Sequence, residues 1–440
     1  MSKLFNLGLY QKRLGANQTV PGATINLGST KGRGSSTRMF NYCKEHSSEP
    51  SLCINQFITI NNISNENSHY LNQNVRSYIK IVPYDKVQPD SILDSLKIRK
   101  AYNVPFINNM NTAKKVIITI IIPYHHPNLK KDLHFVSNLY KLPKPIITIF
   151  NLGSNSNSNS NWNYEANLDV QMCYIMNPYA HIRVIEAASA NLVNIFNAIK
   201  FANNRHNFGN KLDTDIISMS FGAHDTGGYP DLTNITNNPN ICYLAASGDN
   251  QTPSYPSTCP NIMSIGATYL QLDVNNNRIL ETLWQDSGCG LSPSFSKPTY
   301  QIGNAENVIG NTSTQRSVPD LCAIGSTASP IIIYINGKPI AIAGTSVAAP
   351  LVAGLLSLVV QERFNSKHTK PLNTIQKQIS NSIQLQSVLY QNINTPNYTN
   401  LFYDITSGSS NGYSAGLEYD IASGLGVLNI QNVINYLKNL

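Results

Sequence analysis

Residues 343–350 read AGTSVAAP and open the most apolar stretch of the chain, which predicts a helix over residues 346–363. The apolar run within it, residues 348–360, is about a dozen residues long, whereas a bilayer span needs about 20. We therefore predict a buried core helix. Ser346 stands at its start, where the small residues before it permit a sharp turn and the helix N-terminus carries a partial positive charge.

The rest of the chain alternates predicted strands with predicted helices. Strands are predicted at residues 116–122, 145–150, 182–185, 215–221, 241–246 and 262–267, and helices at residues 165–176, 187–203 and 346–363. Several of these strands are apolar throughout, as parallel strands covered on both faces are. The pattern predicts an α/β fold, with a doubly wound, mostly parallel sheet and helices on both faces of one large domain.

A serine hydroxyl needs a base to act as a nucleophile, and histidine is the usual one. The nine histidines are His46, His69, His125, His126, His134, His181, His206, His224 and His368. A subtilisin-type histidine lies in a His-Gly-Thr turn that opens a helix, and this sequence contains no such turn. The run Asp225-Thr226-Gly227 imitates a catalytic aspartate motif, but Gly222-Ala223-His224 precedes it where an apolar strand is needed, so we interpret it as a turn.

Carboxylates offer a second kind of base. Residues 164–171 (YEANLDVQ) predict a helix with Glu165 and Asp169 at i and i+4 on one face, after a polar loop at residues 153–161 (GSNSNSNSN) that we expect at a cleft rim. On a surface helix two like charges form a mildly unfavourable solvated face. In a cleft one carboxylate accepts the serine proton, while the second holds it in place and shares a proton with it.

Further blocks of sequence follow this helix along the chain. They are residues 216–222 (IISMSFG), 245–249 (AASGD), 287–292 (SGCGLS), 298–301 (PTYQ) and 316–320 (RSVPD), followed by the Ser346 block. In this order the chain resembles the sedolisins, the serine-carboxyl peptidases that include tripeptidyl peptidases and acid-acting bacterial endopeptidases. The resemblance runs from about residue 96 to the C-terminus, begins with a match of residues 97–103 to the mature N-terminal segment, and implies a subtilisin-like fold.

The resemblance also implies roles for four residues. Ser346 is the expected nucleophile, Glu165 the base that takes its proton, and Asp169 the residue that orients Glu165. Asp249 matches the oxyanion aspartate, a role that a carboxyl fills only as a neutral acid. We expect a serine-type peptidase with an acidic optimum. Endopeptidase and tripeptidyl peptidase activity remain open, as does a catalytically silent structural or binding protein of the same fold.

Near the C-terminus, residues 404–408 (DITSG) and 419–426 (YDIASGLG) resemble the family's calcium site. The ligands that the resemblance implies for one structural Ca²⁺ are the side chains of Asp404 and Asp420 and the carbonyls of Ile405, Gly416 and Glu418. The family usually has glycine at the position of Glu418. If φ is positive there, a glutamate strains the loop.

Residues 1–90 are predicted to form an N-terminal extension, and residues 91–440 the peptidase domain. The stretch at residues 28–38 (GSTKGRGSSTR) predicts a flexible linker, and the extension is shorter than the usual sedolisin prosegment. Three interpretations of the extension remain open: a reduced prosegment, a remnant of a prosegment, or a segment that never leaves the enzyme. No signal peptide is expected, because polar and basic residues follow the first eight, and an acidic compartment, the extracellular space and a virus particle all remain open.

Composition narrows the partners. The net charge is +8, but only 13% of residues are charged and the cations are dispersed without a binding motif. We therefore expect protein or peptide substrates, no nucleic-acid or membrane partner, and a monomer. The seven cysteines lack Cys-x-x-Cys spacing, so zinc is not expected, while one or two disulfides remain open.

Overall fold

The computed structural model describes residues 73–86, 91–105, 115–154, 158–204, 207, 214–310, 312–365 and 382–438, together with β1 (Gln18–Val20) and β2 (Ala23–Ile25), which pair antiparallel. The predicted linker at residues 28–38 lies outside the described residues, as do Cys43 and Cys53. The five cysteines that are described are buried and carry free thiols.

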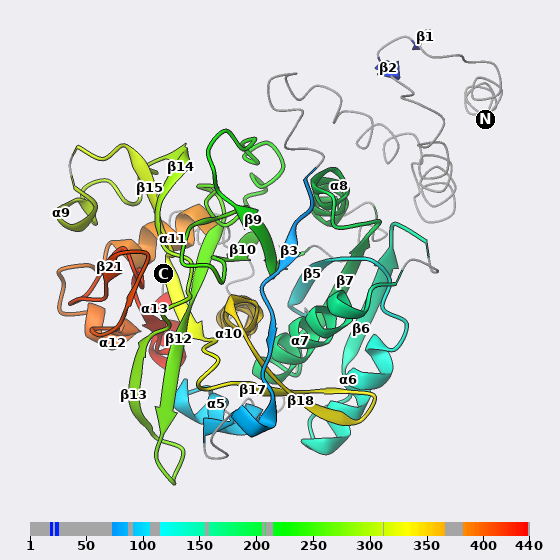
Figure 1. Cartoon of the computed structure of the whole chain (residues 1–440), viewed down its shortest axis with the longest axis horizontal. Coiled ribbons are helices and arrows are strands. Elements are labelled where there is room, and N and C mark those ends of the chain that lie inside the picture. The colour runs from blue at the N-terminus through cyan, green and yellow to red at the C-terminus, as the bar shows by residue number, and fades with distance from the viewer. Residues whose placement is uncertain are drawn as a thin grey trace.

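A ten-stranded sheet forms the centre of the fold, in the order β19-β22-β16-β12-β10-β8-β5-β7-β6, with β13 beside β12 (Figure 1). Its strands are β5 (Ile117–Pro123), β6 (Ile146–Asn151), β7 (His181–Ala187), β8 (Ile216–Met219), β10 (Cys242–Ala246), β12 (Met263–Leu272), β13 (Arg278–Leu283), β16 (Leu321–Ile324), β19 (Phe402–Tyr403) and β22 (Val427–Leu428). The pairs from β6 through β22 are parallel, and only β13 and β19 are antiparallel. The predicted mostly parallel sheet is confirmed.

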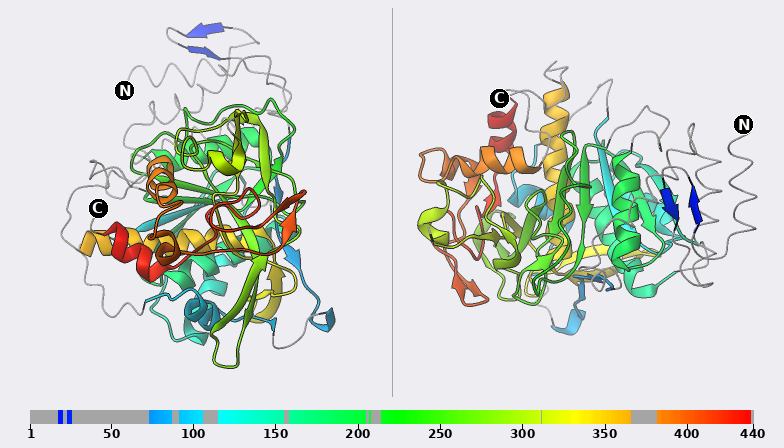
Figure 2. Two further views of the ribbon diagram at one scale, coloured as in Figure 1. Left: turned by 90° about the vertical axis from the view of Figure 1, so that its left-hand side faces the viewer. Right: turned by 90° about the horizontal axis from the view of Figure 1, so that it is seen from above.

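Helices cover both faces of this sheet. The helices of the described residues are α5 (Ser95–Ala101), α6 (Leu129–Leu139), α7 (Ser160–Met176), α8 (Leu192–Asn203), α9 (Glu306–Ile309), α10 (Thr345–Asn365), α11 (Ser382–Tyr390), α12 (Tyr398–Leu401) and α13 (Ile430–Leu437), with a short 3-10 helix, η4 (Tyr84–Lys86). Helices α7 and α10 pack side by side on one face, and α8 lies on the opposite face (Figures 1 and 2). The arrangement brings the starts of two core helices close together.

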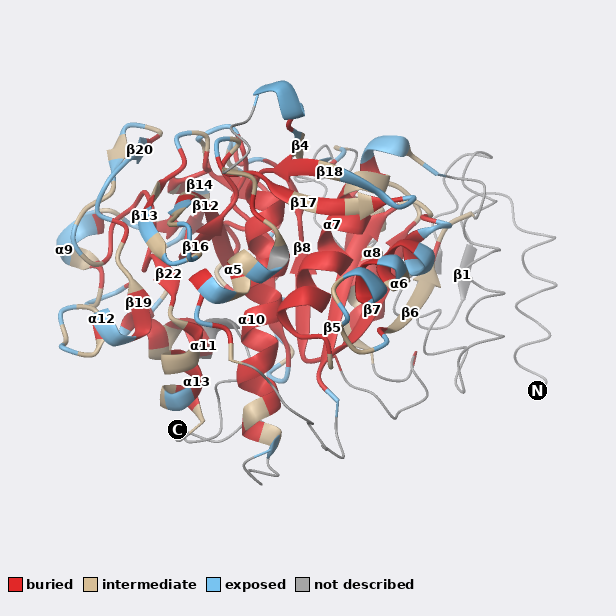
Figure 3. Ribbon diagram, turned by 90° about the horizontal axis from the view of Figure 1, so that it is seen from below, coloured by how far each residue is buried: buried red, intermediate tan, exposed pale blue. Residues whose placement is uncertain are grey.

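Helix α10 lies in the middle of the core. Within the described residues it is the helix long and apolar enough, by length and composition, to cross a membrane, and 89% of its most apolar window is buried inside the protein. Figure 3 shows it buried along most of its length. The prediction of a buried core helix is confirmed.

Several predicted elements have different bounds. The helix predicted at residues 187–203 is α8, which begins only at Leu192, because β7 extends to Ala187 and the Asn191 side chain caps the helix by accepting from the Val193 N–H. Helix α7 begins at Ser160, within the predicted polar loop, because the Asn159 side chain accepts hydrogen bonds from the backbone N–H groups of Asn161 and Trp162 and caps the helix. The single strand predicted at residues 215–221 is divided at Ser220 into β8 and β9 (Phe221–His224). β9 leaves the central sheet and pairs with β11 (Ser254–Tyr255) and β3 (Arg76–Ser77).

The remaining strands form small sheets at the rim. β4 (Lys80–Ile81) pairs with β18 (Lys338–Ala343), which pairs with β17 (Ile331–Ile335); β14 (Gly290–Ser296) pairs with β15 (Gln315–Val318), and β20 (Ser409–Ser410) with β21 (Tyr413–Ser414). Strands β3 and β4 come from residues 73–86, which the predicted boundary at residue 90 assigns to the N-terminal extension. This segment pairs with β9 and with β18 of the body of the fold, and the sequence of the extension did not predict these contacts.

Candidate active site

Part of the site lies just after the parallel strands β8 and β10 of the central sheet, the position at which α/β sheets place ligands, and part follows the antiparallel rim strand β18. Ser346 follows β18 through Gly344 and stands in the first turn of α10, while Asp249 lies three residues after the end of β10. Gly344 has φ of 123°, in the region that favours glycine, and a Cβ there would lie 1.9 Å from the carbonyl oxygen of Tyr78. The sharp turn predicted before Ser346 therefore depends on a residue without a side chain.

Ser346 meets one of the two carboxylates of the predicted helix face directly, and the other through Ser220. Its Oγ lies 3.0 Å from Oε2 of Glu165 and 3.1 Å from the carbonyl oxygen of Ser220. The Ser220 hydroxyl donates a 2.6 Å hydrogen bond to Oδ1 of Asp169. Both acidic side chains are fully buried, so the alternative of a solvated acidic face is wrong.

Burial controls the protonation of this pair. Loss of water raises the pKa of Glu165 well above its usual range, and the neighbouring charge of Asp169 raises it further. Burial likewise raises the pKa of Asp169 well above its usual range, opposed by the hydrogen bond from Ser220. Two buried carboxyls one helical turn apart cannot both ionise cheaply, so the pair holds at least one proton at mildly acid pH.

Asp249 contacts Thr345, the residue that precedes the nucleophile. Its Oδ1 accepts hydrogen bonds of 2.8 Å from both the backbone N–H and the hydroxyl of Thr345. Burial raises the pKa of Asp249 to about 7, even though these two bonds favour the ionised form. Below neutrality the side chain is a neutral acid, which is the form that donates a hydrogen bond.

Each of the three carboxyls leaves one oxygen without a partner. Oε1 of Glu165, Oδ2 of Asp169 and Oδ2 of Asp249 are buried and accept no hydrogen bond among the described residues. Such atoms are rare in proteins because an unsatisfied buried acceptor is costly. A carboxyl oxygen that is buried without a donor disfavours the ionised form, which agrees with the raised pKa of all three side chains.

A segment from the predicted extension lies across the nucleophile. The backbone N–H of Tyr78 donates to Oγ of Ser346 at 3.1 Å, and the backbone N–H of Ser346 donates to the carbonyl oxygen of Tyr78 at 3.2 Å. Figure 1 shows this segment running from β3 beside β9 to the edge of β18. Residue 78 thus occupies the space in front of Ser346.

The Tyr78 side chain fills a pocket beside Asp249. Its hydroxyl hydrogen-bonds the Ser254 hydroxyl, and the ring is 4% exposed. A Cβ on Gly222 would lie 2.8 Å from the Tyr78 hydroxyl oxygen, and one on Gly248 would lie 3.7 Å from its ring. The two glycines therefore make room for the ring.

The other candidates for catalysis lie elsewhere. Among the described residues Ser346 hydrogen-bonds no histidine, and His125, for example, pairs with Glu186 at 2.8 Å. Asp225 accepts hydrogen bonds from the hydroxyl groups of Ser292 and Ser294 and from the N–H of Gly227. This supports the interpretation of residues 225–227 as a turn.

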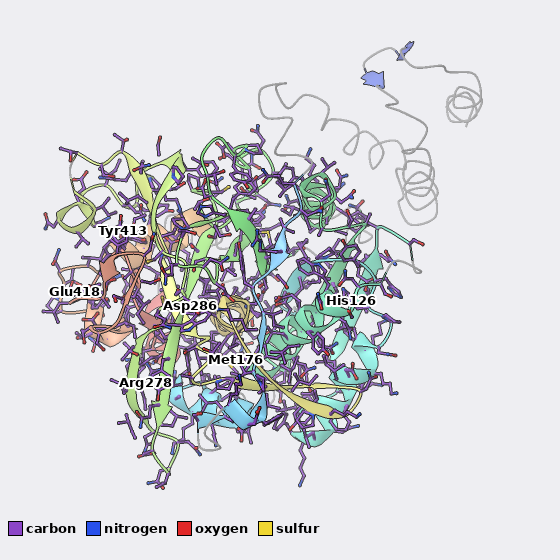
Figure 4. All side chains as sticks on the ribbon, in the orientation of Figure 1. His126, Met176, Arg278, Asp286, Tyr413 and Glu418 are labelled. Carbon is purple, nitrogen blue, oxygen red and sulfur yellow. The ribbon has the colours of Figure 1, made fainter. Side chains whose placement is uncertain are left out.

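The predicted metal ligands lie together in the C-terminal loops. Asp404 accepts a 2.9 Å hydrogen bond from the N–H of Glu418, and Asp420 accepts one of 3.1 Å from the N–H of Gly416. Glu418, at the periphery of the view in Figure 4, has φ of 58°, so the condition for a strained loop is met. The described residues hold no group of three or more His, Cys, Asp or Glu side chains around one point. Two carboxylates and the carbonyls of this loop, Ile405 included, are the oxygen donors that a hard cation takes.

Sequence reasoning missed three residues of the site. Ser220 links Asp169 to Ser346, Thr345 holds Asp249, and Tyr78 covers Ser346. The first two lie inside recognised blocks, where their position next to a candidate residue was the available signal. Tyr78 lies outside the region of resemblance and carried no signal.

Comparison with known proteins gives the family. A model described as the subtilase family matches residues 180–412, which is 233 of the 440 residues. The chain belongs to the subtilase family. Tripeptidyl-peptidase sed1 of Aspergillus fumigatus is 27% identical to this subtilase over 261 residues, which cover 52% of the chain and 37% of that protein. Kumamolisin of a Bacillus species is 28% identical over 294 residues, which cover 60% of this chain and 48% of that protein.

A solved structure agrees in fold. Pseudomonas sedolisin, described as a serine-carboxyl proteinase and solved with pseudo-iodotyrostatin, matches 80% of this subtilase and 99% of its own chain, with a TM-score of 0.64 and 19% identity. The predicted sedolisin resemblance and the subtilisin-like fold are confirmed. The matched regions span about half or less of the curated relatives.

Proposed function

We propose that this subtilase is a serine-type peptidase that hydrolyses peptide bonds at acidic pH. The observation that carries the proposal is the 3.0 Å approach of Ser346 Oγ to Glu165, within a buried cluster where three carboxyl oxygens lack partners. A base within hydrogen-bond reach of a serine at a helix start is the arrangement of an activated nucleophile.

Each residue has a role in the proposed reaction. Ser346 attacks the peptide carbonyl, Glu165 takes its proton and returns it to the leaving amine, and Asp169 orients Glu165 and shares a proton with it. Protonated Asp249 and the backbone N–H of Ser346 donate to the oxyanion. Because Asp249 loses its proton near pH 7, activity falls as the pH rises through neutrality.

The path of residues 73–78 towards Ser346 favours an endopeptidase over a tripeptidyl peptidase. Residues 73–78 lie there in extended form, with Val75 N–H donating to Ala190 O and residues 76 and 77 paired with β9. A tripeptidyl peptidase must close its groove three residues before the cleaved bond, but six residues are accommodated here. We infer cleavage within chains.

A structural Ca²⁺ is the proposed cofactor. Asp404 and Asp420 would hold it with the carbonyls of Ile405, Gly416 and Glu418, and the ion would supply the positive charge that ties the two carboxylates to one loop. We expect about one calcium per chain by elemental analysis after gel filtration. We also expect a chelator to lower the melting temperature and added Ca²⁺ to restore it. The same decrease is expected in Ser346→Ala. An unchanged melting temperature together with a metal-free protein would contradict the site.

The proposal is tested by digestion of a denatured protein between pH 3 and pH 8. The wild-type chain is expected to digest it best in acid and Ser346→Ala not at all. Ser357→Ala, which removes another buried hydroxyl from α10, is the control and should retain activity. If the folded wild-type protein and a folded Tyr78→Gly variant, which lacks the side chain beside Ser254, both digest nothing at any pH, the silent structural or binding protein replaces this proposal.

A further inference from the structure

Residues 73–82 show how an extended peptide lies across Ser346. The backbone N–H of Tyr78 donates to Oγ of Ser346, and the backbone N–H of Ser346 donates to the carbonyl oxygen of Tyr78. The segment continues as β4, in which Lys80 and Ile81 pair with β18. A substrate that follows this path with its reacting carbonyl at Ser346 therefore places the second residue after the cleaved bond at the position of Lys80.

The side chain at that position meets two residues of the body of the fold. Nζ of Lys80 lies 2.8 Å from Oδ2 of Asp286 and 4.6 Å from the centre of the Trp284 ring. Figure 4 labels Asp286 near the middle of the view. Because the side chains of a strand alternate, Ile81 points to the other side, and it is 52% exposed. The two contacts are thus specific to one position of the extended peptide.

The acid and the indole are held in place by the body of the fold. The Trp284 N–H donates to the carbonyl oxygen of Ala267 in β12, and the Asp286 carbonyl oxygen accepts from the N–H of Gln251, both at 3.0 Å. Trp284 is 4% exposed, whereas the Asp286 side chain is 31% exposed. Because the backbone of both residues is fixed before a ligand arrives, little conformational entropy is lost when a side chain binds here.

The chemistry of these two groups selects a cation. A carboxylate pairs with an ammonium or a guanidinium group, and the face of an indole ring attracts the same groups through its negative charge density. A neutral side chain gains only the contact with the ring. An acidic side chain is repelled by Asp286. Lysine and arginine are therefore the side chains that use both groups.

We propose that Asp286 and Trp284 form a binding site for a lysine or arginine side chain at the second residue after the cleaved bond. The inference rests on the peptidase function proposed above, and it names the substrate class of that site. The preferred residue belongs to the part of the substrate that leaves as the amine product. The site therefore affects kcat/KM, and it does not affect the later hydrolysis of the ester on Ser346.

Asp286 also lies near the acid that is proposed to stabilise the oxyanion. Burial is the main cause of the raised pKa of Asp249, while the charge of Lys80 lowers this pKa and the charge of Asp286 raises it. Replacing Asp286 therefore changes the overall activity for a second reason. The preference is measured as a ratio of two substrates on the same variant, in which a general change of activity cancels.

The test is digestion of a denatured peptide library at pH 5, with the cleavage sites identified by mass spectrometry. Lysine and arginine should be enriched at the second residue after the cut and not at the third, which corresponds to Ile81. Peptides that differ only at the second residue then give kcat/KM. Lysine should exceed glutamine about fivefold, because a partly exposed ion pair and a cation over an indole ring are each weak contacts.

Charge variants assign the preference to one side chain. Asp286→Asn should reduce the ratio of lysine to glutamine to about twofold or less, because only the ring contact remains. Asp286→Lys should make a glutamate peptide a better substrate than the lysine peptide. Glu362→Gln, which removes a carboxylate near the far end of α10, is the control and should leave the ratio unchanged.

The outcomes separate this inference from the peptidase function. The full-length chain and the folded Tyr78→Gly variant are both used, with Ser346→Ala as the blank. If either cleaves the library without a preference at the second residue, or with a preference that persists in Asp286→Asn, the inference is overturned and the peptidase stands. If neither cleaves any peptide, the peptidase function fails and the inference fails with it.

Discussion

The active site and the acidic loop near the C-terminus, residues 404–420, both contain buried or half-buried carboxyl groups, but these groups differ in the number of hydrogen-bond donors around them. Around Ser346, each of three carboxyls has one oxygen without a donor. At Asp420, each oxygen has two donors: the N–H groups of Ala422 and Ser423 on Oδ1, and the Gly416 N–H and the Ser423 hydroxyl on Oδ2. Burial raises the pKa of Asp420 as well, but four donors hold that side chain in its loop, whereas each acid around Ser346 keeps one oxygen that no donor occupies.

The largest expected effect comes from removing the proton acceptor. Glu165→Gln keeps the shape of the side chain but cannot accept the Ser346 proton, so kcat should fall on the order of 10³–10⁴-fold, about as far as in Ser346→Ala. Because the two residues act as a unit, the double variant should lose no more than either single one. Turnover of a denatured protein substrate in acid measures all three variants. Additive losses would show that Glu165 does not activate Ser346.

Replacement of Asp249, the acid proposed to stabilise the oxyanion, is expected to have the next largest effect on kcat. Asp249→Ala removes the donor and should lower kcat about 10²–10³-fold. Asp249→Asn should lose less, because the amide oxygen can accept from Thr345 while the NH₂ group takes the place of the protonated Oδ2. An amide does not ionise, so the fall in activity that Asp249 causes near pH 7 should disappear in this variant. If the pH profile is unchanged in Asp249→Asn, the loss of activity near pH 7 comes from the Glu165 and Asp169 pair.

Stability should depend on pH through the same residue. The pKa of Asp249 rises from 3.8 to about 7 on folding, so the folded state binds the proton more tightly. This contribution is fully present below about pH 4 and is lost as the pH rises through about 7. In a Ser346→Ala background, which prevents self-digestion, Asp249→Asn should reduce the loss of unfolding free energy between pH 5 and pH 8 by about 3 kcal/mol. The measurement is the unfolding free energy from urea titrations at each pH. Equal losses between pH 5 and pH 8 with and without Asp249→Asn would contradict this prediction.

The acidic loop gives the smallest effect. Glu418 has a left-handed backbone, which costs about 1 kcal/mol for a residue with a Cβ. Glu418→Gly and Glu418→Ala both lose the carboxylate that accepts from the Asn394 N–H, so they differ only in the Cβ. The glycine variant should be about 1 kcal/mol more stable in urea unfolding. Equal stabilities would mean that the loop is not strained.

The sequence predicted the site where its residues share an element or a block. The spacing of Glu165 and Asp169 became one buried helix face because four residues make about one turn. The divided strand at Ser220 was missed because apolar residues continue across it, and the chain changes sheet there for tertiary reasons. Helix α7 began early because Asn159, within a repetitive run, acts as its cap.

By itself the sequence determined the order of strands and helices, the turn before Ser346 and the pairing of Glu165 with Asp169, because these depend on neighbours within a few residues. Only the tertiary structure decided that Ser346 meets Glu165 across 181 positions and Tyr78 across 268. It also decided which carboxyls keep their protons, because a raised pKa is a property of burial and of missing donors, and both are set by segments far away in the chain.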